Sequence, residues 1–168
     1  MKVEGVMSKS VGMCGQHQSL NDAARIMWER DCGIVPIVAS DEDGRVVGMV
    51  TDRDICIAAY TKGRRLQDIP IADVMSKKVV SCRASDELGA AERTMQQAQV
   101  HRLPVVDDGG RLLGVLSLAD IARATARGAR DKVSAGEVGE TLAAIRRSRA
   151  LEVSPTRPSE PRGQRVRS

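Results

Sequence analysis

Residues 101–121 read HRLPVVDDGGRLLGVLSLADI, and residues 33–55 read GIVPIVASDEDGRVVGMVTDRDI. Each stretch has a short apolar run containing a proline, a turn rich in aspartate and glycine, and a second apolar run. Two apolar runs around such a turn predict a β-hairpin. A threonine or serine then stands three residues before an aspartate, which is typical of a helix N-terminus. The chain therefore contains one strand–turn–strand–helix pattern twice.

The similarity extends outward from these two stretches. At a spacing of 68 residues the motif VMSK at 6–9 recurs at 74–77, and the apolar positions Leu20, Ala23 and Met27 recur as Leu88, Ala91 and Met95. After the turn, which is two residues shorter in the second copy, the spacing is 66, and Gly48 and Asp54 recur as Gly114 and Asp120. Neither copy has enough core to be stable alone, so we expect them to pack sheet to sheet around a pseudo-two-fold axis.

The period of the apolar residues predicts the elements of each copy. Helical spacing follows Ser19, which forms a capping-box pattern with Asp22. The sequence predicts helices at 20–30, 52–60, 88–97 and 118–126, and strands at 34–38, 46–50, 103–106 and 112–116. The fold class is therefore mixed α/β (α+β), with two β-α-β-β-α units.

The order of elements, the strand HRLPVVD at 101–107, and the endings GxxTxxD and GxxSxxD resemble the CBS domain pair, also called a Bateman module. The resemblance covers roughly residues 3–128. It divides the chain into a first repeat at 3–62, a linker at 63–73 and a second repeat at 74–128. Because the linker is short, we expect the two halves to stay together.

The two helix starts after the hairpins are candidate ligand sites. A helix N-terminus offers unpaired N–H groups and a partial positive charge, which suit a phosphate. The resemblance implies that Asp54 and Asp120 hold a ribose, and that Thr51 and Ser117 approach phosphate. It also implies that adenine lies near four further residues, namely Gly12, Ile34, Val80 and Leu103. The alternative is that each Thr/Ser-x-x-Asp is only a capping box, which stabilises its helix by about 1 kcal/mol.

Charged residues beside these positions distinguish the two copies. Arg102 carries a planar fork of donors for phosphate oxygens, and His101 adds a donor. The alternative is an exposed pair at a sheet edge. The first copy has the uncharged Gly33 and Ile34 at these positions, so we expect the two clefts to bind unequally. Arg53 is a further phosphate candidate, against the alternative that it is simply solvated.

Composition argues against other classes of function. Hydrophobic residues make up 42% of the chain, but there is no Phe, and Trp28 and Tyr60 are the only other aromatic residues counted. Single-stranded nucleic-acid binders usually stack bases on aromatic side chains, so that class is disfavoured. We expect Trp28 and the methionines at helical spacing to be packing residues.

Cysteine and histidine positions predict no metal site. The four cysteines are at least 18 residues apart, and no histidines cluster with them. We expect reduced, mostly buried thiols. The absence of a signal-like run or a long apolar stretch predicts a cytoplasmic protein without membrane contact.

The basic charge is concentrated at the C-terminal end. The net charge is +4, and residues 146–168 hold seven Arg against two Glu, a net of +5, which leaves about −1 for residues 1–145. We expect a disordered basic tail at 151–168 because its apolar content is low. We expect an extra helix within 129–150, with Val138, Leu142 and Ile145 on one face.

These observations predict a regulatory protein and not an enzyme, because no nucleophile elbow, P-loop or paired metal ligands occur at usable spacing. The expected ligand is AMP, ADP or ATP, with S-adenosylmethionine as another candidate, and no cofactor is obligatory. The resemblance implies a homodimer that modulates an unidentified partner. One alternative is a dimerising scaffold whose arginine-rich tail contacts nucleic acid or an acidic partner, although the near-neutral folded part argues against nucleic acid. Another is a structural module with empty clefts.

Overall fold

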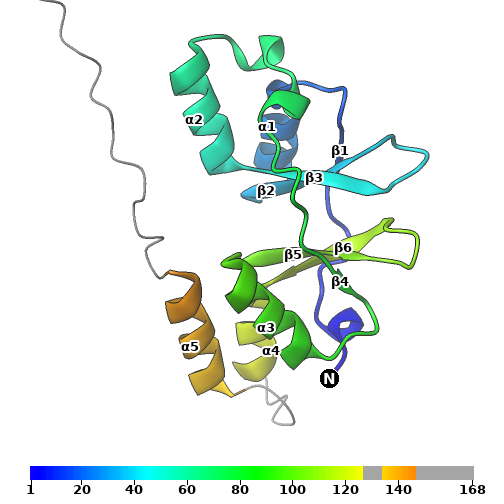
Figure 1. Cartoon of the computed structure of the whole chain (residues 1–168), viewed down its shortest axis with the longest axis vertical. Helices are drawn as coiled ribbons and strands as arrows, with labels where there is room; N and C mark the ends of the chain where they lie inside the picture. The colour runs from blue at the N-terminus through cyan, green and yellow to red at the C-terminus, as the bar shows by residue number, and fades with distance from the viewer. Residues whose placement is uncertain (127–133, 147–168) are drawn as a thin grey trace, which may run out of the picture.

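The computed structural model describes residues 1–126 and 134–146, and Figure 1 shows them as two stacked units whose sheets face each other. The first unit contains β1 (Cys14–Gly15), α1 (Leu20–Glu29), β2 (Ile34–Val38), β3 (Val46–Thr51) and α2 (Asp52–Lys62). The second contains β4 (Cys82–Arg83), α3 (Leu88–Ala98), β5 (Arg102–Val106), β6 (Leu112–Ser117) and α4 (Leu118–Ala126), followed by α5 (Ala135–Ile145). The predicted α/β class and the twofold β-α-β-β-α order are confirmed. The tail expected at 151–168 lies outside the described residues.

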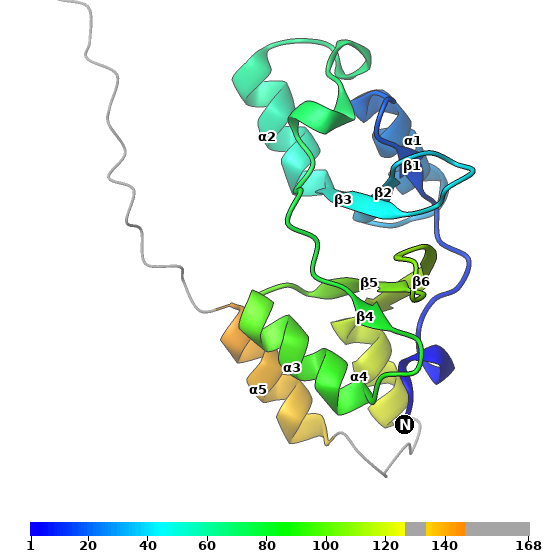
Figure 2. The same ribbon diagram turned by 45° about the vertical axis from the view of Figure 1, so that its right-hand side comes forward.

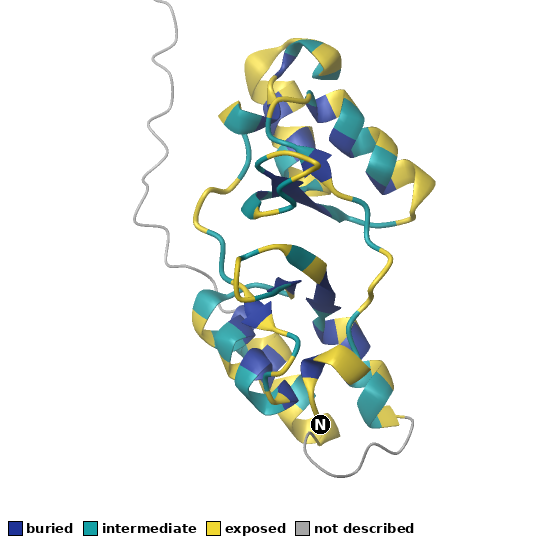
Figure 3. Ribbon diagram, turned by 90° about the vertical axis from the view of Figure 1, so that its right-hand side faces the viewer, coloured by how far each residue is buried: buried dark blue, intermediate teal, exposed yellow. Residues whose placement is uncertain are grey.

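Each sheet has the same topology. The middle strand, β2 or β5, pairs in parallel with the short strand before it and in antiparallel with the strand after it. The helices cover the outer face of each sheet, and the inner faces meet between the units (Figure 2). The helices and strands turn their buried residues toward one another within each unit (Figure 3). The two cores are therefore separate, one in each unit.

Two short segments are exchanged between the units. Val3, at the start of the 3₁₀ helix Val3–Gly5, is fully buried in the core of the second unit. Its counterpart Ile71, in the 3₁₀ helix Ile71–Asp73, is fully buried in the core of the first unit. Leu88 N donates to Met1 O at 2.8 Å, and Leu20 N donates to Ile69 O at 3.0 Å in the same way. The structural units therefore do not coincide with the sequence repeats. The predicted linker at 63–73 supplies Ile69 and Ile71 to the core of the first unit.

Two glycines allow these segments to cross the hairpins. A Cβ at Gly114 would lie 2.5 Å from the carbonyl oxygen of Ser8, and a Cβ at Gly48 would lie 2.6 Å from Sδ of Met75. Ser8 and Val115 exchange backbone hydrogen bonds of 2.9 and 3.0 Å across the crossing at Gly114. The repeated motif VMSK and the repeated glycine therefore belong to one contact, in which each copy's motif lies on the other copy's hairpin.

The tips of the two hairpins also meet. Val46 N donates to Gly110 O, and Leu112 N donates to Gly44 O, both at 3.0 Å. Gly44 and Gly110 have φ values of +63° and +79°, a conformation that glycine adopts without strain. These reciprocal bonds, together with the crossings, hold the two sheets face to face.

Helix α5 packs on α3 and α4 of the second unit (Figure 1). It is present within the range predicted for an extra helix. Ile145 is buried and Val138 packs against the second core, but Leu142 is 45% exposed. Thr141, which is completely buried, accepts a hydrogen bond from Gln96 Nε2 at 2.5 Å and donates one to Glu92 Oε1 at 2.6 Å. This polar contact fixes the register of α5 on α3.

The expectation that Trp28 is a packing residue was wrong, and the expectation of mostly buried thiols holds for two of the four cysteines. Trp28 is 88% exposed on α1, so it is not a packing residue, because the helix turns Leu20, Ala23 and Met27 to the core instead. Cys56 is exposed on α2, whereas Cys14 and Cys82 are buried as expected. Burial raises the pKa of the Cys14 thiol to about 11 and that of Cys82 to about 12. The two buried thiols are therefore protonated at neutral pH.

Candidate functional site

Both predicted helix N-termini form the expected capping boxes. Thr51 N and Oγ1 donate to Asp54 Oδ2 at 2.9 and 2.7 Å, and Asp54 N donates back to Thr51 Oγ1 at 3.2 Å. Ser117 N and Oγ donate to Asp120 Oδ2 at 2.8 and 2.5 Å, and Asp120 N donates back at 3.1 Å. In both boxes Oδ2 serves the cap; Oδ1 of Asp120 accepts a hydrogen bond from Arg123, whereas Oδ1 of Asp54 has no such partner among the described residues. The capping interpretation and the ligand interpretation are thus compatible.

A cavity of about 370 Å³ opens beside Asp120, and we call it the Asp120 cleft. Its walls come from the segment before β1, the end of α1, the start of β2 and the start of α4. The lining includes Ser8, Ser10, Val11, Gly12, Arg30, Asp31, Cys32, Gly33, Ile34, Pro36, Arg102, Val115, Ser117, Ala119, Asp120 and Arg123. It brings together five of the predicted site residues: Gly12, Ile34, Arg102, Ser117 and Asp120.

Three arginines enter this cleft from different elements. Arg30 ends α1, Arg102 begins β5, and Arg123 lies in α4. Arg123 pairs with Asp120 Oδ1, whereas neither Arg30 nor Arg102 forms an ion pair within the described part of the chain. Asp31 and Asp120 are the acidic residues of the lining, so the arginines leave an excess of positive charge. The cleft therefore suits an anionic ligand.

The second cleft, which we call the Asp54 cleft, has a cavity of about 260 Å³. Its lining includes Ile34, Met49, Thr51, Asp54, Ser76, Lys78, Val80, Val100, His101, Arg102 and Pro104. It collects six of the predicted residues, and Ile34 and Arg102 line both clefts. At the positions equivalent to Arg30, Arg102 and Arg123 the other copy has Ala98, Ile34 and Ile57. The Asp120 cleft has three cationic side chains against two carboxylates, and the Asp54 cleft has Lys78 and Arg102 against Asp54, so the two linings differ in the number of charged groups and not in net charge.

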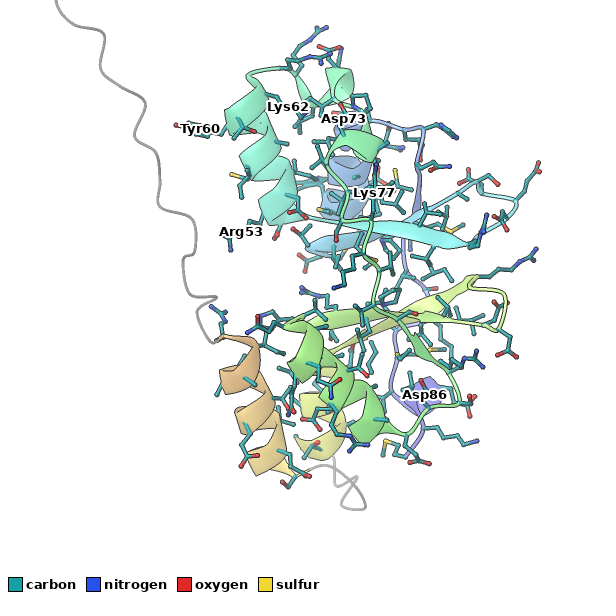
Figure 4. All side chains as sticks on the ribbon, in the orientation of Figure 1. Arg53, Tyr60, Lys62, Asp73, Lys77 and Asp86 are labelled. Atoms are coloured by element: carbon teal, nitrogen blue, oxygen red, sulfur yellow. The ribbon has the colours of Figure 1, made fainter. Side chains whose placement is uncertain are left out.

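Two predicted site residues lie elsewhere. Leu103 is fully buried in the core of the second unit and lines neither cleft, because alternation along β5 turns it away from the neighbouring Arg102. Arg53 is exposed and points outward from the start of α2 (Figure 4). Sequence analysis missed Arg30 and Arg123. Arg123 has a signal, since it follows Asp120 by one helical turn, but only the tertiary structure brings Arg30 to the same cleft.

Gly12 is needed where the chain passes α1. A Cβ at this position would lie 2.3 Å from Cγ2 of Ile26 and 3.0 Å from Cδ of Arg30. Any side chain would push the segment away from α1, and with it the wall of the Asp120 cleft. Glycine at this position therefore allows the backbone to pass close to Ile26 and Arg30.

His101 lies at the start of β5, where its carbonyl oxygen accepts a hydrogen bond from Leu118 N at 2.9 Å. Burial lowers the pKa of its imidazole below the ordinary value of 6.5, and the positive charges of Arg146 and Arg102 lower the pKa further. The side chain is therefore neutral at pH 7. It offers a phosphate a hydrogen bond rather than a charge.

Comparisons with known proteins concern the repeated fold as a whole. A family model described as CBS domain matches residues 3–60 and 71–127. CBS domain-containing protein YhcV of Bacillus subtilis is 36% identical over 120 residues, which cover 71% of this chain and 82% of that protein. The CBS domain pair of protein MJ0100, in complex with 5'-methylthioadenosine and S-adenosyl-L-methionine, has a TM-score of 0.66 and 26% identity over 78% of this chain and 98% of that chain. CBSX2 in complex with AMP has a TM-score of 0.65 and 25% identity over 75% of this chain and 96% of that chain.

Proposed function

This chain belongs to the CBS domain family, and from that premise we propose that it is a regulatory protein that binds an adenine nucleotide in the Asp120 cleft. The observation that carries the proposal is the convergence of Arg30, Arg102 and Arg123 on a cavity that also holds the cap Ser117–Asp120. Related CBS pairs bind adenosine compounds, including AMP. The arginines favour AMP, ADP or ATP over S-adenosylmethionine, because its sulfonium group is positively charged.

The roles of the side chains follow from their hydrogen bonds. Oδ2 of Asp120 is held by the cap, so the ribose hydroxyls would donate to Oδ1, which Arg123 occupies. If a ribose hydroxyl shares or replaces the hydrogen bond from Arg123 to Oδ1, the Arg123 guanidinium would be able to turn toward the phosphate. Ser117 and the first N–H groups of α4 would face the same phosphate. Gly12, Ile34 and Pro36 would cover the adenine ring.

The Asp54 cleft is proposed as a second, weaker site. It keeps Thr51 and Asp54, and its lining has two cationic side chains, Lys78 and Arg102, against three in the Asp120 cleft. Val80 and His101 would cover the ring there, and Lys78 and Arg102 would supply the positive charge. An adenosine compound with fewer negative charges suits this cleft better.

We infer binding rather than catalysis for this protein. Within residues 1–126 and 134–146, no three His, Cys, Asp or Glu side chains lie close enough together to hold a metal ion. The two carboxylates at the clefts are engaged as caps, so a role for them in proton transfer has no support.

None of the described helices is long and apolar enough to cross a membrane. We keep the cytoplasm as the proposed location.

We also propose that the protein forms a homodimer through α1 and α2. On the second unit, Gln96 lies under α5; its equivalent on the first unit is Trp28, which is exposed. A groove lined by Ala24, Met27, Trp28, Asp52 and Ile55 is open at this place. A second copy suits it because a two-fold axis through the groove places both copies of Trp28 in the interface. Nucleotide binding would then reach a regulated partner protein through the packing of the two units.

Calorimetric titration of AMP, ADP, ATP and S-adenosylmethionine tests the ligand proposal. We expect saturable binding of the phosphorylated compounds that is lost in Asp120→Ala. Asp54→Ala should remove only a second, weaker binding step. Asp22→Ala is the matched control, because Asp22 forms a capping box with Ser19 but lines neither cleft. No heat from any of the four compounds would refute the proposal.

A further inference from the structure

A cavity of about 460 Å³ lies between α5, α4 and the start of β5, and we call it the α5 cavity. It is lined by His101, Arg102, Ser117, Leu118, Ala119, Ala122, Val138, Leu142 and Arg146. Three of these residues, Arg102, Ser117 and Ala119, also line the Asp120 cleft. The two cavities are therefore neighbours that share the N-terminus of α4 as a common wall.

The rim of the α5 cavity is positively charged. Arg102 and Arg146 lie on it, and the lining contains no acidic residue among those that the structure describes. Neither arginine forms an ion pair within residues 1–126 and 134–146. The lowered pKa of His101, caused first by burial and then by Arg146 and Arg102, agrees with the closeness of the three groups. This positive charge is not balanced by the described protein, so an anionic group would be stabilised here.

The position of Arg146 depends on how α5 is held. Arg146 follows directly after Ile145, which is buried against the second core. One turn earlier, the buried Thr141 is fixed by hydrogen bonds with Glu92 and Gln96 of α3. These contacts set the rotation and register of α5. They place Arg146, the residue directly after the helix, in the lining of the cavity.

Resting on the proposed function, we propose that the α5 cavity receives the terminal phosphates of an adenosine di- or triphosphate whose nucleoside occupies the Asp120 cleft. Arg102, shared by both cavities, would contact the first phosphate. Arg146 would contact the phosphates beyond it and so distinguish ADP and ATP from AMP. The C-terminal helix would thereby be part of the ligand site.

This arrangement couples the ligand to the docking of α5. A ligand that contacts Arg146 holds α5 on α3 and α4, whereas AMP leaves that contact unmade. By linkage, the factor by which ADP or ATP stabilises docked α5 equals the factor by which docking of α5 strengthens their binding, and AMP has no such coupling. The number of phosphates on the bound nucleotide would therefore determine how firmly α5 is docked on α3 and α4.

Calorimetry with metal-free AMP, ADP and ATP on the full chain tests this specificity. In Arg146→Gln we expect ADP and ATP to bind about tenfold more weakly, because a charge-assisted contact is lost, and AMP to bind as in the wild type. The control is Arg93→Gln, the same change of charge at an exposed position of α3 that lines none of the cavities described above. It should alter none of the three affinities.

The possible failures separate the two proposals. If AMP binds but Arg146→Gln leaves ADP and ATP unchanged, or weakens all three equally, the role of the α5 cavity is wrong and the proposed function stands. If no adenylate binds the wild type, both are wrong. Hydrogen exchange gives a second measure: ATP should slow exchange in α5 more than AMP does at equal saturation, and equal protection would also overturn the proposal.

Discussion

Arg102 and Ser117 are direct partners in the antiparallel ladder of β5 and β6, at the end where α4 begins. The equivalent pair in the first unit is Ile34 and Thr51. The register therefore places a guanidinium beside one helix N-terminus and an aliphatic side chain beside the other. This difference supports the proposal that the two clefts bind unequally.

Arg102→Gln should weaken AMP binding about tenfold or more, because the α-phosphate loses a charge-assisted hydrogen bond. The melting temperature should stay within the range of the wild type, since the side chain is exposed. Calorimetry measures the affinity. Arg53→Gln is the control, because Arg53 is also exposed but lines neither cleft. Equal losses in both variants would mean that only the overall charge matters.

Asp22→Asn should change how stability depends on pH. Hydrogen bonds from the Ser19 side chain and backbone hold the pKa of the Asp22 carboxyl below its ordinary value of 3.8. Its contribution is therefore complete above that value and is lost as the pH falls through the folded-state pKa. We expect the variant to lose about 1 kcal/mol of unfolding free energy at pH 6. The difference from wild type should shrink below about pH 3.8 in urea titrations. A constant difference would contradict this assignment.

Gly114→Ala should destabilise the crossing between the units. The new methyl group would overlap the carbonyl oxygen of Ser8, at 2.5 Å, so we expect a loss of about 1–3 kcal/mol in urea unfolding. Nucleotide binding should weaken too, because Ser8 and Val115 line the Asp120 cleft. In the control Gly139→Ala the methyl group meets nothing within 4 Å on α5, and helix propensity should raise stability by about 0.5–1 kcal/mol.

The homodimer can be tested at Trp28. Sedimentation should show a dimer for the wild type and a monomer for Trp28→Gln, which gives α1 the residue that α3 has at the same place. Trp28 emission should shift to shorter wavelength as the protein concentration rises, because the indole leaves water. Leu113→Gln, at a side chain that is 41% exposed on β6, is the control and should remain a dimer. A monomeric wild type would refute the interface.

Periodicity and internal repetition were sufficient to predict most of the elements. The hairpins, the caps and the helix after each hairpin depend on contacts between residues close in sequence, such as Thr51 with Asp54. The same is true of the predicted site, since Ser117, Asp120 and Arg102 lie in or beside one hairpin. Trp28 was misassigned because helical spacing alone does not say which face has a partner. Leu103 was misassigned because adjacent residues of a strand point to opposite sides.

The repeated sequence thus determined the β-α-β-β-α unit, its duplication and the chemistry at each helix N-terminus, because all of these arise from neighbouring residues. The tertiary structure alone decided which unit buries Val3 and Ile71, and that Arg30 lines the same cleft as Asp120. It also decided that α5 lies on the second unit, with Arg146 beside His101. These relationships join residues far apart in the chain, and they depend on how the two units pack, which no local pattern encodes.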